Sequence, residues 1–495
     1  MELAFDFSSL FSIDVLIALL IGSFAGMIIG AIPGLGAVLA IVLMLPLTYT
    51  MEPLAAILML LATYQCAEYG GSISAIVIGI PGHPASLVTA IDGNALAKNS
   101  SPGKALAYSL YASFIGGVVS ALLLILLSVP LVNFALKISA PEYFMIGVLG
   151  LIGVSALSTK DINKSFISGI LGLMAGTVGM DMFTGESRFT LGRIELMEGI
   201  GLIALLVGMF AFSEVFDIIS KDLNKKYVTD KKGLKVKLTT KEFKKVIEPI
   251  GIGSIVGSIV GMFPGMGAGP SSWFAYSIAK SRTKNPKTFG KGNPDGIVAP
   301  ESANNATVGG ALIPLLSLGI PGSPATAIIL GAFIIHGLQP GPKLFTSNPD
   351  IAYGIMYGFI LTTIFMLVMG KFVTSWFSRL LTVSNPVLIS MVLVFSLIGV
   401  YVERNAYFDL WLALIIGLIT FILYKFNYSI ASFILAFILS GIIEENLRRS
   451  LMLSGGSYDI FFTRTYSLIL FIIIVLIILF SIWNIFKKKK EAGES

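Results

Sequence analysis

The sequence of 495 residues predicts an all-α polytopic membrane protein, made of two inverted-topology repeats with broken or re-entrant helical hairpins. Three observations predict this fold: the composition, a repeated pair of Gly/Pro motifs, and the distribution of lysines. The chain is 55% hydrophobic and 13% charged, whereas soluble proteins average about 25% charged residues. Apolar runs of about 18 residues or more recur along its length, as in membrane-spanning helices, and we expect about 11 to 13 crossings.

The plainest candidate spans share an apolar composition without charges. They are Ile13–Ile32, Leu106–Val129, Gly199–Phe216, Tyr353–Met369, Trp411–Tyr424 and Leu468–Phe486, although the first includes Asp14 and the third includes Glu214. The residues before Ile13 include no basic residue, so we expect a true first span there rather than a cleaved signal peptide.

The first apolar run contains a motif that must interrupt a helix. Val15–Leu47 carries no charge over 33 residues (15 through 47). As one helix it would extend about 50 Å, against a hydrocarbon thickness of about 30 Å. Pro33 removes a main-chain donor, and Gly34 and Gly36 permit backbone angles that other residues avoid, so the break is expected there. The same reasoning predicts a second break at Pro264–Gly267.

Two motifs recur in the same order, which indicates an internal duplication. Gly30–Ala37 (GAIPGLGA) returns as Gly261–Ala268 (GMFPGMGA) with an offset of 231 (261 − 30). Gly79–Gly82 returns as Gly319–Gly322 with an offset of 240 (319 − 79). We therefore divide the chain into an N-terminal repeat, a Lys-rich linker, a C-terminal repeat, and a terminal span with a basic tail: residues 1–220, 221–245, 246–466 and 467–495.

The lysines predict how the chain is oriented. Lys221–Lys245, Lys280–Lys291 and Lys487–Lys490 hold ten, five and four basic residues, 19 of the 34 in the chain. The positive-inside rule places these three segments in the cytoplasm. The N-terminal flank has Glu2 and Asp6 but no basic residue, so it is expected outside. The first spans of the two halves would then cross in opposite directions, as in many secondary transporters.

The second motif pair is polar as well as broken, which favours a binding site for an anion. Helices that start after Pro81–Gly82 and Pro321–Gly322 would point free N–H groups and positive dipole ends at the breaks. Nearby hydroxyls can donate to a carboxylate. The predicted substrate-binding residues are Gly34, Gly36, Gly71, Ser72, Ser74, Pro81, Gly82, His83, Gly265, Gly267, Asn304, Asn305, Gly310, Pro321, Gly322, Ser323 and Thr326.

Each of these assignments has a structural alternative. The glycines could simply allow close packing of a helical hairpin, and a Ser or Thr could bond to its own helix. The run ESANNAT, Glu301–Thr307, could belong to the substrate or ion site or to a cytoplasm-facing loop, and the residues leave both open. His83 has Ser323 as its counterpart in the repeat, so it could add charge to one side of the site only.

The composition also narrows the class of function. The lone Cys66 excludes an internal disulfide, and two histidines make a His/Cys metal site a poor choice. Basic loops between spans do not suit nucleic-acid binding. Only Glu68 and Glu301 stand near the motifs as acids, without a nucleophile–base set, so we do not expect an enzyme. No cofactor is expected beyond a coupling ion, Na⁺, which main-chain carbonyls freed near Gly34, Gly265 or Asn304 would suit.

Three long motifs resemble those of a known family. They are GAIPGLGAVLAIVLMLPLTY from Gly30, YGGSISAIVIGIPGHPASLVTAIDG from Tyr69 and GALIPLLSLGIPGSPATAIILGAFIIHGLQPGPKLF from Gly310. They resemble the large membrane subunit of the tripartite tricarboxylate transporters, the TctA-type permease family, over most of the chain.

The resemblance implies a multi-pass permease of the bacterial inner membrane that imports tricarboxylate or dicarboxylate anions on an ion gradient. It also implies two partners, a small four-span membrane subunit and a periplasmic binding protein that delivers the substrate. The alternative is a stand-alone secondary transporter or channel for another small solute.

Gly34→Leu or Gly265→Leu is expected to abolish uptake while leaving membrane insertion intact, because a branched side chain would disturb the backbone of the break. Uptake of labelled carboxylate into cells, set against the amount of each variant in isolated membranes, checks this. Normal uptake by both variants would count against a functional role for the breaks.

Overall fold

A computed structural model of the chain describes residues 5–156, 162–220, 238–380 and 385–491, and these are almost entirely helical. Within the described residues, six helices are long and apolar enough to cross a membrane: Ile13–Ala31, Pro102–Ala135, Leu202–Ser220, Pro349–Thr374, Tyr407–Lys425 and Ile430–Leu453. The prediction of an all-α polytopic membrane protein is confirmed. The number of crossings and the opposed orientation of the repeats stay predictions.

The span Ile430–Leu453 escaped the list of plainest candidates because its final two turns are charged. Glu444, Glu445, Arg448 and Arg449 follow an apolar stretch in one continuous helix. All four make ion pairs, Arg448 with Glu444 at 2.9 Å and Arg449 with Glu445 at 2.5 Å. Pairing of this kind at i, i+4 lets a helix carry a charged end beyond its apolar part.

The described chain divides into two compact units, each with segments from both halves of the sequence. The first comprises Met1–Leu131, Leu202–Met262 and Met266–Phe421, and the second comprises Val132–Gly201, Phe263–Gly265 and Ile422–Ser495. The sequence-based division into repeats stays a prediction, and residues 221–237 of its linker lie outside the described part. Helix α5 (Pro102–Ala135) and helix α18 (Tyr407–Lys425) each run from one unit into the other.

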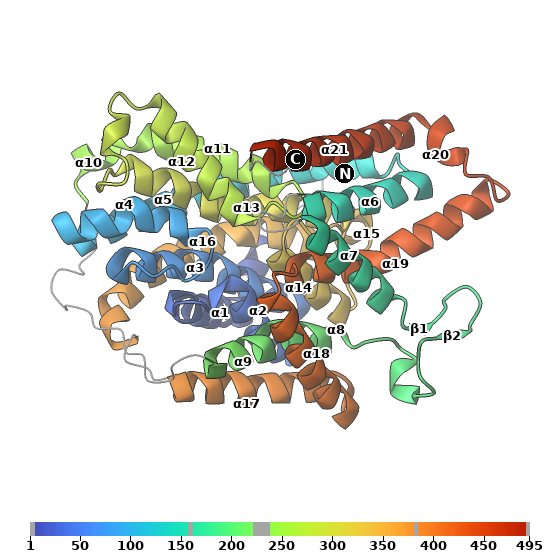
Figure 1. Cartoon of the computed structure of the whole chain (residues 1–495). Helices are drawn as coiled ribbons and strands as arrows, with labels where there is room; N and C mark the ends of the chain where they lie inside the picture. The colour runs from blue at the N-terminus through green and yellow to red at the C-terminus, as the bar shows by residue number, and fades with distance from the viewer. Residues whose placement is uncertain (1–4, 157–161, 221–237, 381–384, 492–495) are drawn as a thin grey trace. The chain divides into compact units, whose positions relative to one another are not determined.

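The first unit contains the helices that carry the two repeated motifs (Figure 1). Besides most of α5 and α18, its elements are η1 (Phe7–Phe11), α1 (Ile13–Ala31), α2 (Gly36–Met44), η2 (Leu45–Thr50), α3 (Pro53–Ile78), α4 (Ser86–Asn99), α8 (Leu202–Leu206), the π-helical turn η4 (Val207–Phe212), α9 (Ser213–Ser220), α10 (Thr240–Lys245), α11 (Ile247–Gly261), α12 (Ala268–Arg282), η5 (Pro286–Thr288), α13 (Asp295–Leu318), α14 (Pro324–Ile335), α15 (Pro342–Ser347), α16 (Pro349–Leu380) and α17 (Asn385–Arg404).

Helices α1 and α3 lie side by side because one face of α1 has no side chains (Figure 1). A Cβ atom added at Gly22, Gly26 or Gly30 would lie 2.2, 2.3 or 2.3 Å from the main-chain oxygen of Met59, Thr63 or Ala67. Glycines four residues apart allow such close backbone contact, which drives association where water provides no hydrophobic force.

The second repeat makes the same contact with the same spacing. On α11, a Cβ added at Gly253, Gly257 or Gly261 would lie 2.2, 2.2 or 2.7 Å from the main-chain oxygen of Ala299, Ala303 or Thr307 on α13. These positions follow their counterparts by 231 residues on the first helix (253 − 22) and 240 on the second (299 − 59). The order helix, break, helix, long helix, break, helix thus occurs twice, once in α1–α4 and once in α11–α14.

Basic residues gather at one end of the first unit, where α4, α10 and α12 lie together (Figure 1). Lys104, at the start of α5, forms an ion pair with Glu242 of α10. This ammonium, with hydrogen bonds from Thr239, lowers the pKa of Glu242 to about 2. The described end of the Lys-rich linker is therefore fixed to the loop between α4 and α5.

The second unit contains the remaining helices and one short hairpin. Its elements are α6 (Ala140–Ala156), α7 (Ile162–Gly176), β1 (Gly179–Met180), β2 (Ser187–Arg188), η3 (Ile194–Leu196), α19 (Ile430–Leu453), α20 (Ile460–Thr463) and α21 (Thr465–Glu491). Strands β1 and β2 pair antiparallel, with Gly179 opposite Arg188. Helix α21 contains the predicted span Leu468–Phe486.

Ion pairs fasten the hairpin to α19. Arg448 donates to both oxygens of Asp181 at 2.9 and 2.7 Å, and Arg188 donates to Glu444 at 2.6 Å. The Arg448 guanidinium and the main-chain N–H of Phe183 hold the pKa of Asp181 well below its ordinary value. Arg188 and Glu444 help to line a hollow of about 260 Å³ between the hairpin and α19.

Gly26→Ala and Gly257→Ala are each expected to lower the free energy of unfolding by about 1–3 kcal/mol, because the new methyl group would overlap a backbone oxygen of the neighbouring helix. Thermal denaturation of the purified protein in detergent measures the effect. Gly251→Ala on α11 is the matched control, since a Cβ there meets no described atom within 4 Å. Equal stability of all three variants would contradict the packing described.

Candidate functional site

The two predicted breaks of the first repeat exist, and they touch each other. Helix α1 ends at Ala31 and α2 begins at Gly36, with positive φ angles of 91° at Gly34 and 64° at Gly36. The Gly34 N–H donates to the carbonyl oxygen of Gly82 in the second break at 3.2 Å. The first break is therefore held by the main chain of the second.

The second break folds back onto the helix that precedes it. Helix α3 ends at Ile78, and the Gly82 N–H donates to the Gly71 carbonyl oxygen at 3.2 Å. A Cβ atom at Gly71 would lie 2.1 Å from Cδ2 of His83. The predicted site residues Gly71, Gly82 and His83 therefore pack directly on one another, and the glycine makes room for the imidazole.

The second repeat closes its second break differently. An added Cβ at Gly322 would approach the Gly261 oxygen to 2.8 Å, and one at Gly310 would approach the Ser258 oxygen to 2.4 Å, so both glycines serve close packing. Ser323 and Thr326 form a reciprocal capping box on α14. Helix α4, by contrast, has Ala85 as its N-cap and no side-chain cap. Of the two predicted helix N-termini, only the one after Pro321–Gly322 has a side-chain cap, whereas Ser86 and Val88 of α4 donate to the main-chain oxygens of His83 and Ala85 at 3.2 and 3.3 Å.

The first break of the second repeat stands apart from these contacts. Gly265 and Gly267 have positive φ angles of 84° and 61°, which confirms the predicted break. A Cβ added at Gly267 would meet no described atom within 4 Å. Two residues later, however, a Cβ added at Gly269 would lie 4.0 Å from Cβ of Pro84, next to His83.

The run Glu301–Thr307 is not a loop. It lies inside α13 and is fully buried, so the alternative of a cytoplasm-facing loop is wrong. Glu301 and the two asparagines bond to groups of α3, α4 and α5, and Ser302 and Thr307 bond to main-chain oxygens of α13 and α11. These bonds replace those to water, so a polar sequence is stable inside a buried helix.

Glu301 is the most densely bonded side chain of this region. Its Oε1 accepts hydrogen bonds from Ser72 of α3 and Thr89 of α4, both at 2.5 Å. Its Oε2 accepts from Ser109 and Ser113 of α5, at 3.0 and 3.1 Å. Four hydroxyls from the first repeat thus surround one carboxylate from the second, and hydrogen bonds to an ionised group are the strong ones.

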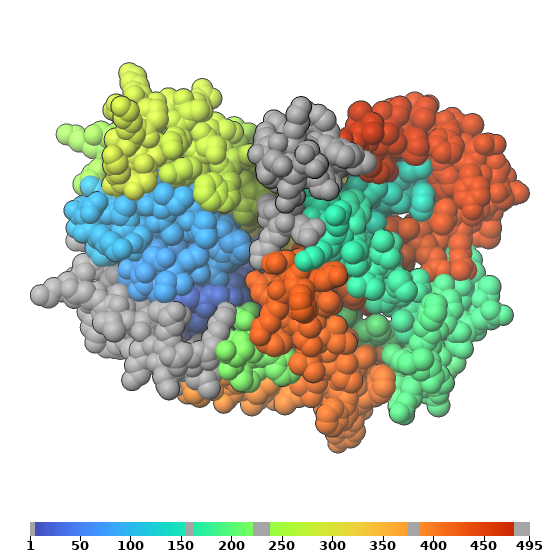
Figure 2. All heavy atoms as spheres, viewed as in Figure 1, coloured from blue at the N-terminus to red at the C-terminus, as the bar shows by residue number. Residues whose placement is uncertain are grey.

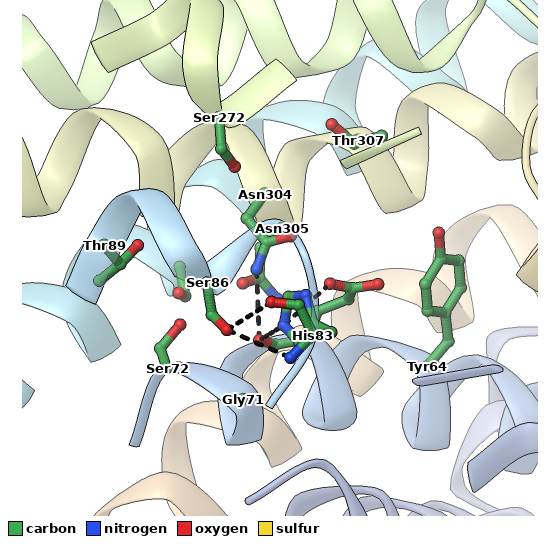
Figure 3. Close-up of polar contacts among 12 residues, drawn as sticks. Tyr64, Gly71, Ser72, His83, Ser86, Thr89, Ser272, Asn304, Asn305 and Thr307 are labelled. Carbon is green, nitrogen blue, oxygen red and sulfur yellow. Dashed lines mark hydrogen bonds and ion pairs between the residues drawn. The ribbon is translucent and has the colours of Figure 1, made fainter. Parts of the chain in front are cut away.

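Glu68 and His83 lie in the same buried region as Asn304 and Asn305. His83 Nε2 lies 2.9 Å from the main-chain oxygen of Glu68 and 3.3 Å from its Oε2. Asn304 also donates to the Glu68 main-chain oxygen, at 3.2 Å, and Asn305 donates to that of Gln65, at 3.0 Å. Figure 3 shows His83, Asn304 and Asn305 pointing toward one another. We call these four side chains together with Gln65, Ser72, Thr89, Ser109, Ser113 and Glu301 the polar centre.

A second carboxylate joins the repeats in the reverse direction. Asp92 of α4 is fully buried, and its Oδ1 accepts the N–H groups of Gly290, Gly292 and Asn293 at 2.9, 2.9 and 2.8 Å. Its Oδ2 accepts from the Tyr276 hydroxyl at 3.0 Å. The loop between α12 and α13 is thereby fixed on α4, and Figure 2 shows the two surfaces in contact, light blue against yellow-green.

Several predicted hydroxyls have structural roles. Ser74 donates to the Gly71 carbonyl of its own helix at 3.1 Å, and Ser323 contacts Tyr64 at 3.3 Å besides its capping bonds. Pro81 is partly exposed in the break. The substrate-binding role of the whole predicted set stays a prediction.

The residues predicted from the sequence did not include Gln65, Ser109, Ser113 and Asp92. Spacing could have found three of them. Gln65 precedes Glu68 and Ser72 at helical intervals of three and four, and Ser109 and Ser113 are four apart, so each set shares one helix face. Asp92 gives no such signal, because its partners are main-chain groups about 200 residues later.

A bundle of apolar helices, broken twice in each repeat around buried polar side chains, defines the class of a polytopic membrane permease. The profile of the Tripartite tricarboxylate transporter TctA family matches residues 16–435. The chain belongs to this family, so it is a multi-pass membrane protein and the large subunit of a transporter that has further subunits.

Two relatives come from Agrobacterium vitis. The "Uncharacterized 52.8 kDa protein in TAR-I ttuC' 3'region" is 36% identical over 444 residues, which cover 90% of this chain and 88% of that protein. The "Uncharacterized protein in TAR-II ttuC' 3'region" is 34% identical over 194 residues, which cover 39% of this chain and 80% of that protein. No solved structure matches the chain.

Glu301→Gln is expected to lower the free energy of unfolding by about 2 kcal/mol or more, because an amide NH₂ would replace one oxygen that accepts two hydroxyl bonds. Chemical denaturation in detergent measures the change. Ser72→Ala should destabilise in the same direction, whereas the matched Ser74→Ala loses only a bond within its own helix. A Glu301→Gln variant as stable as the wild type would show that the carboxylate does not hold the repeats together.

Proposed function

We propose that this chain is the permease subunit of an ion-coupled transporter that imports tricarboxylate or dicarboxylate anions across the bacterial inner membrane. A small four-span membrane subunit would accompany it, and a periplasmic binding protein would deliver the substrate. Membership of the TctA family supports the class of substrate and the tripartite assembly. The expectation that the chain catalyses no chemical reaction accords with this role.

The observation that carries the proposal is the asymmetry between the two second breaks. At α14 the Ser323–Thr326 box already occupies the helix end, whereas α4 begins without a side-chain cap beside His83. An uncapped helix N-terminus attracts anions, and a protonated His83 would add to that attraction. We therefore place the carboxylate of the substrate at the break Gly79–Ala85.

Binding at this break also offers a route to ion coupling. The break is bonded to α3 through Gly82 and His83, and α3 contacts α13 in the polar centre. Carbonyl and carboxylate oxygens near broken helices are the ligands that Na⁺ takes in secondary transporters. Sodium is thus the coupling ion that we propose.

Proteoliposomes with the chain, its small subunit and the binding protein are expected to accumulate citrate or a dicarboxylate only with an inward Na⁺ gradient. Uptake should collapse in K⁺ medium with the proton gradient maintained, and it should stop when the binding protein is omitted. Uptake driven by the proton gradient alone would exclude Na⁺ coupling. Full uptake without the binding protein would favour a stand-alone transporter or channel.

A further inference from the structure

Four side-chain oxygens at the crossing of α3 and α13 are buried without a hydrogen-bond donor among the described residues. They are Gln65 Oε1, Glu68 Oε2, Asn304 Oδ1 and Asn305 Oδ1. Glu68 is 7% exposed and the other three residues are fully buried. Buried acceptors are nearly always paired, so four together at one place require an explanation.

The contacts of the two asparagines join each of them to one of the two α3 residues. Asn304 Nδ2 donates to the main-chain oxygen of Glu68, and Asn305 Nδ2 donates to that of Gln65. These bonds fix the orientation of both amides, since exchanging nitrogen and oxygen would set two acceptors against each other. The Oδ1 atoms therefore stay on the side of each amide that makes no hydrogen bond among the described residues.

The two buried carboxylates of the polar centre differ in how they are satisfied. Glu301 accepts four hydroxyl bonds, two on each oxygen. Glu68 Oε2 lies 3.3 Å from His83 Nε2, but that nitrogen makes its shorter contact, 2.9 Å, with the Glu68 main-chain oxygen. Glu68 Oε2 accepts no hydrogen bond among the described residues, so its lone pairs are open to a ligand.

The chemistry of the four oxygens selects the kind of ligand. One carboxylate and three amide oxygens attract a cation and repel the carboxylate of a substrate. Hard cations prefer oxygen ligands, and a single carboxylate matches a single positive charge better than Ca²⁺, whose sites use several acids. No group of three or more His, Cys, Asp or Glu residues that could hold a metal occurs among the described residues.

We infer that Gln65, Glu68, Asn304 and Asn305 form a sodium site, separate from the anion site at the α4 break. The choice of Na⁺ rests on the proposed function. The position of the site rests on the four buried oxygens that accept no hydrogen bond. Of the positions expected for Na⁺ from the sequence, the site includes Asn304 and not Gly34 or Gly265. Because His83 contacts Glu68, the ion would lie one side chain away from the break that takes the substrate.

The test is a titration of the full chain in detergent with NaCl, at constant ionic strength made up with choline chloride, followed by thermal unfolding. Na⁺ is expected to raise the unfolding temperature of the wild type saturably. Glu68→Gln and Asn304→Ala should each raise the half-saturating Na⁺ concentration tenfold or more. Thr63→Val on α3 and Thr307→Val on α13 are the matched controls, since the Thr63 hydroxyl donates to a main-chain oxygen of α3 and the Thr307 hydroxyl to main-chain oxygens of α11 and α13.

A third variant keeps the inference testable if the first two fail to fold. Gln65→Glu has nearly the same shape and adds a second carboxylate, so it should bind Na⁺ more tightly and acquire a response to Ca²⁺. An unchanged half-saturating concentration in Glu68→Gln or Gln65→Glu would overturn the site. So would equal stabilisation by KCl and NaCl, or a response to pH with none to Na⁺.

Uptake assays separate a failure of the site from a failure of the proposed function. Sodium-coupled uptake with an unchanged Na⁺ dependence in Glu68→Gln would leave the function standing and reject the site. Sodium binding that depends on Glu68, in a transporter whose uptake ignores Na⁺, would support the site and reject the coupling.

Discussion

A helix that breaks inside a membrane must find partners for the main-chain groups it frees, because lipid offers none. In this protein the two breaks of the first repeat hydrogen-bond to each other through their main chains. Gly34 donates to Gly82, and Gly82 donates to Gly71, so three glycines link α1, α3 and the start of α4 through the backbone. This chain of bonds holds His83 against α3, and the arrangement of the polar centre depends on it.

The polar centre forms because α1 packs closely on α3 and α11 packs closely on α13. Helices whose backbones touch along glycine faces leave the opposite faces of α3 and α13 free to meet each other. There each repeat provides one carboxylate that accepts hydrogen bonds from the other repeat. Glu301 of the second repeat enters a ring of hydroxyls from the first, and Asp92 of the first accepts main-chain N–H groups of the second. Removing one carboxylate would strand several donors at once.

The duplication does not make the two halves equivalent. The same succession of helices and breaks has a histidine at position 83 and a serine at position 323. This difference changes the N-terminus of the helix that follows each break. Ser323 caps its own helix, whereas His83 turns to α3 and leaves α4 uncapped. Two similar scaffolds therefore present one helix end with a side-chain cap and one without, and our proposal of an anion site separate from the cation site builds on this difference.

The sequence by itself determined the elements and their interruptions. Composition predicted membrane helices, and Pro33, Gly34, Gly265 and Gly267 marked the breaks, because backbone angles and missing donors are local properties. The motifs also carried the family. The tertiary structure alone decided which polar residues are satisfied and which are left over. Ser72 and Ser74 look alike in the sequence, yet only Ser72 reaches Glu301, and Gln65 and Asp92 gain their importance from partners more than 180 residues away. Which polar side chains hydrogen-bond to each other across the fold depends on how the helices pack, and the sequence of a single helix does not determine that packing.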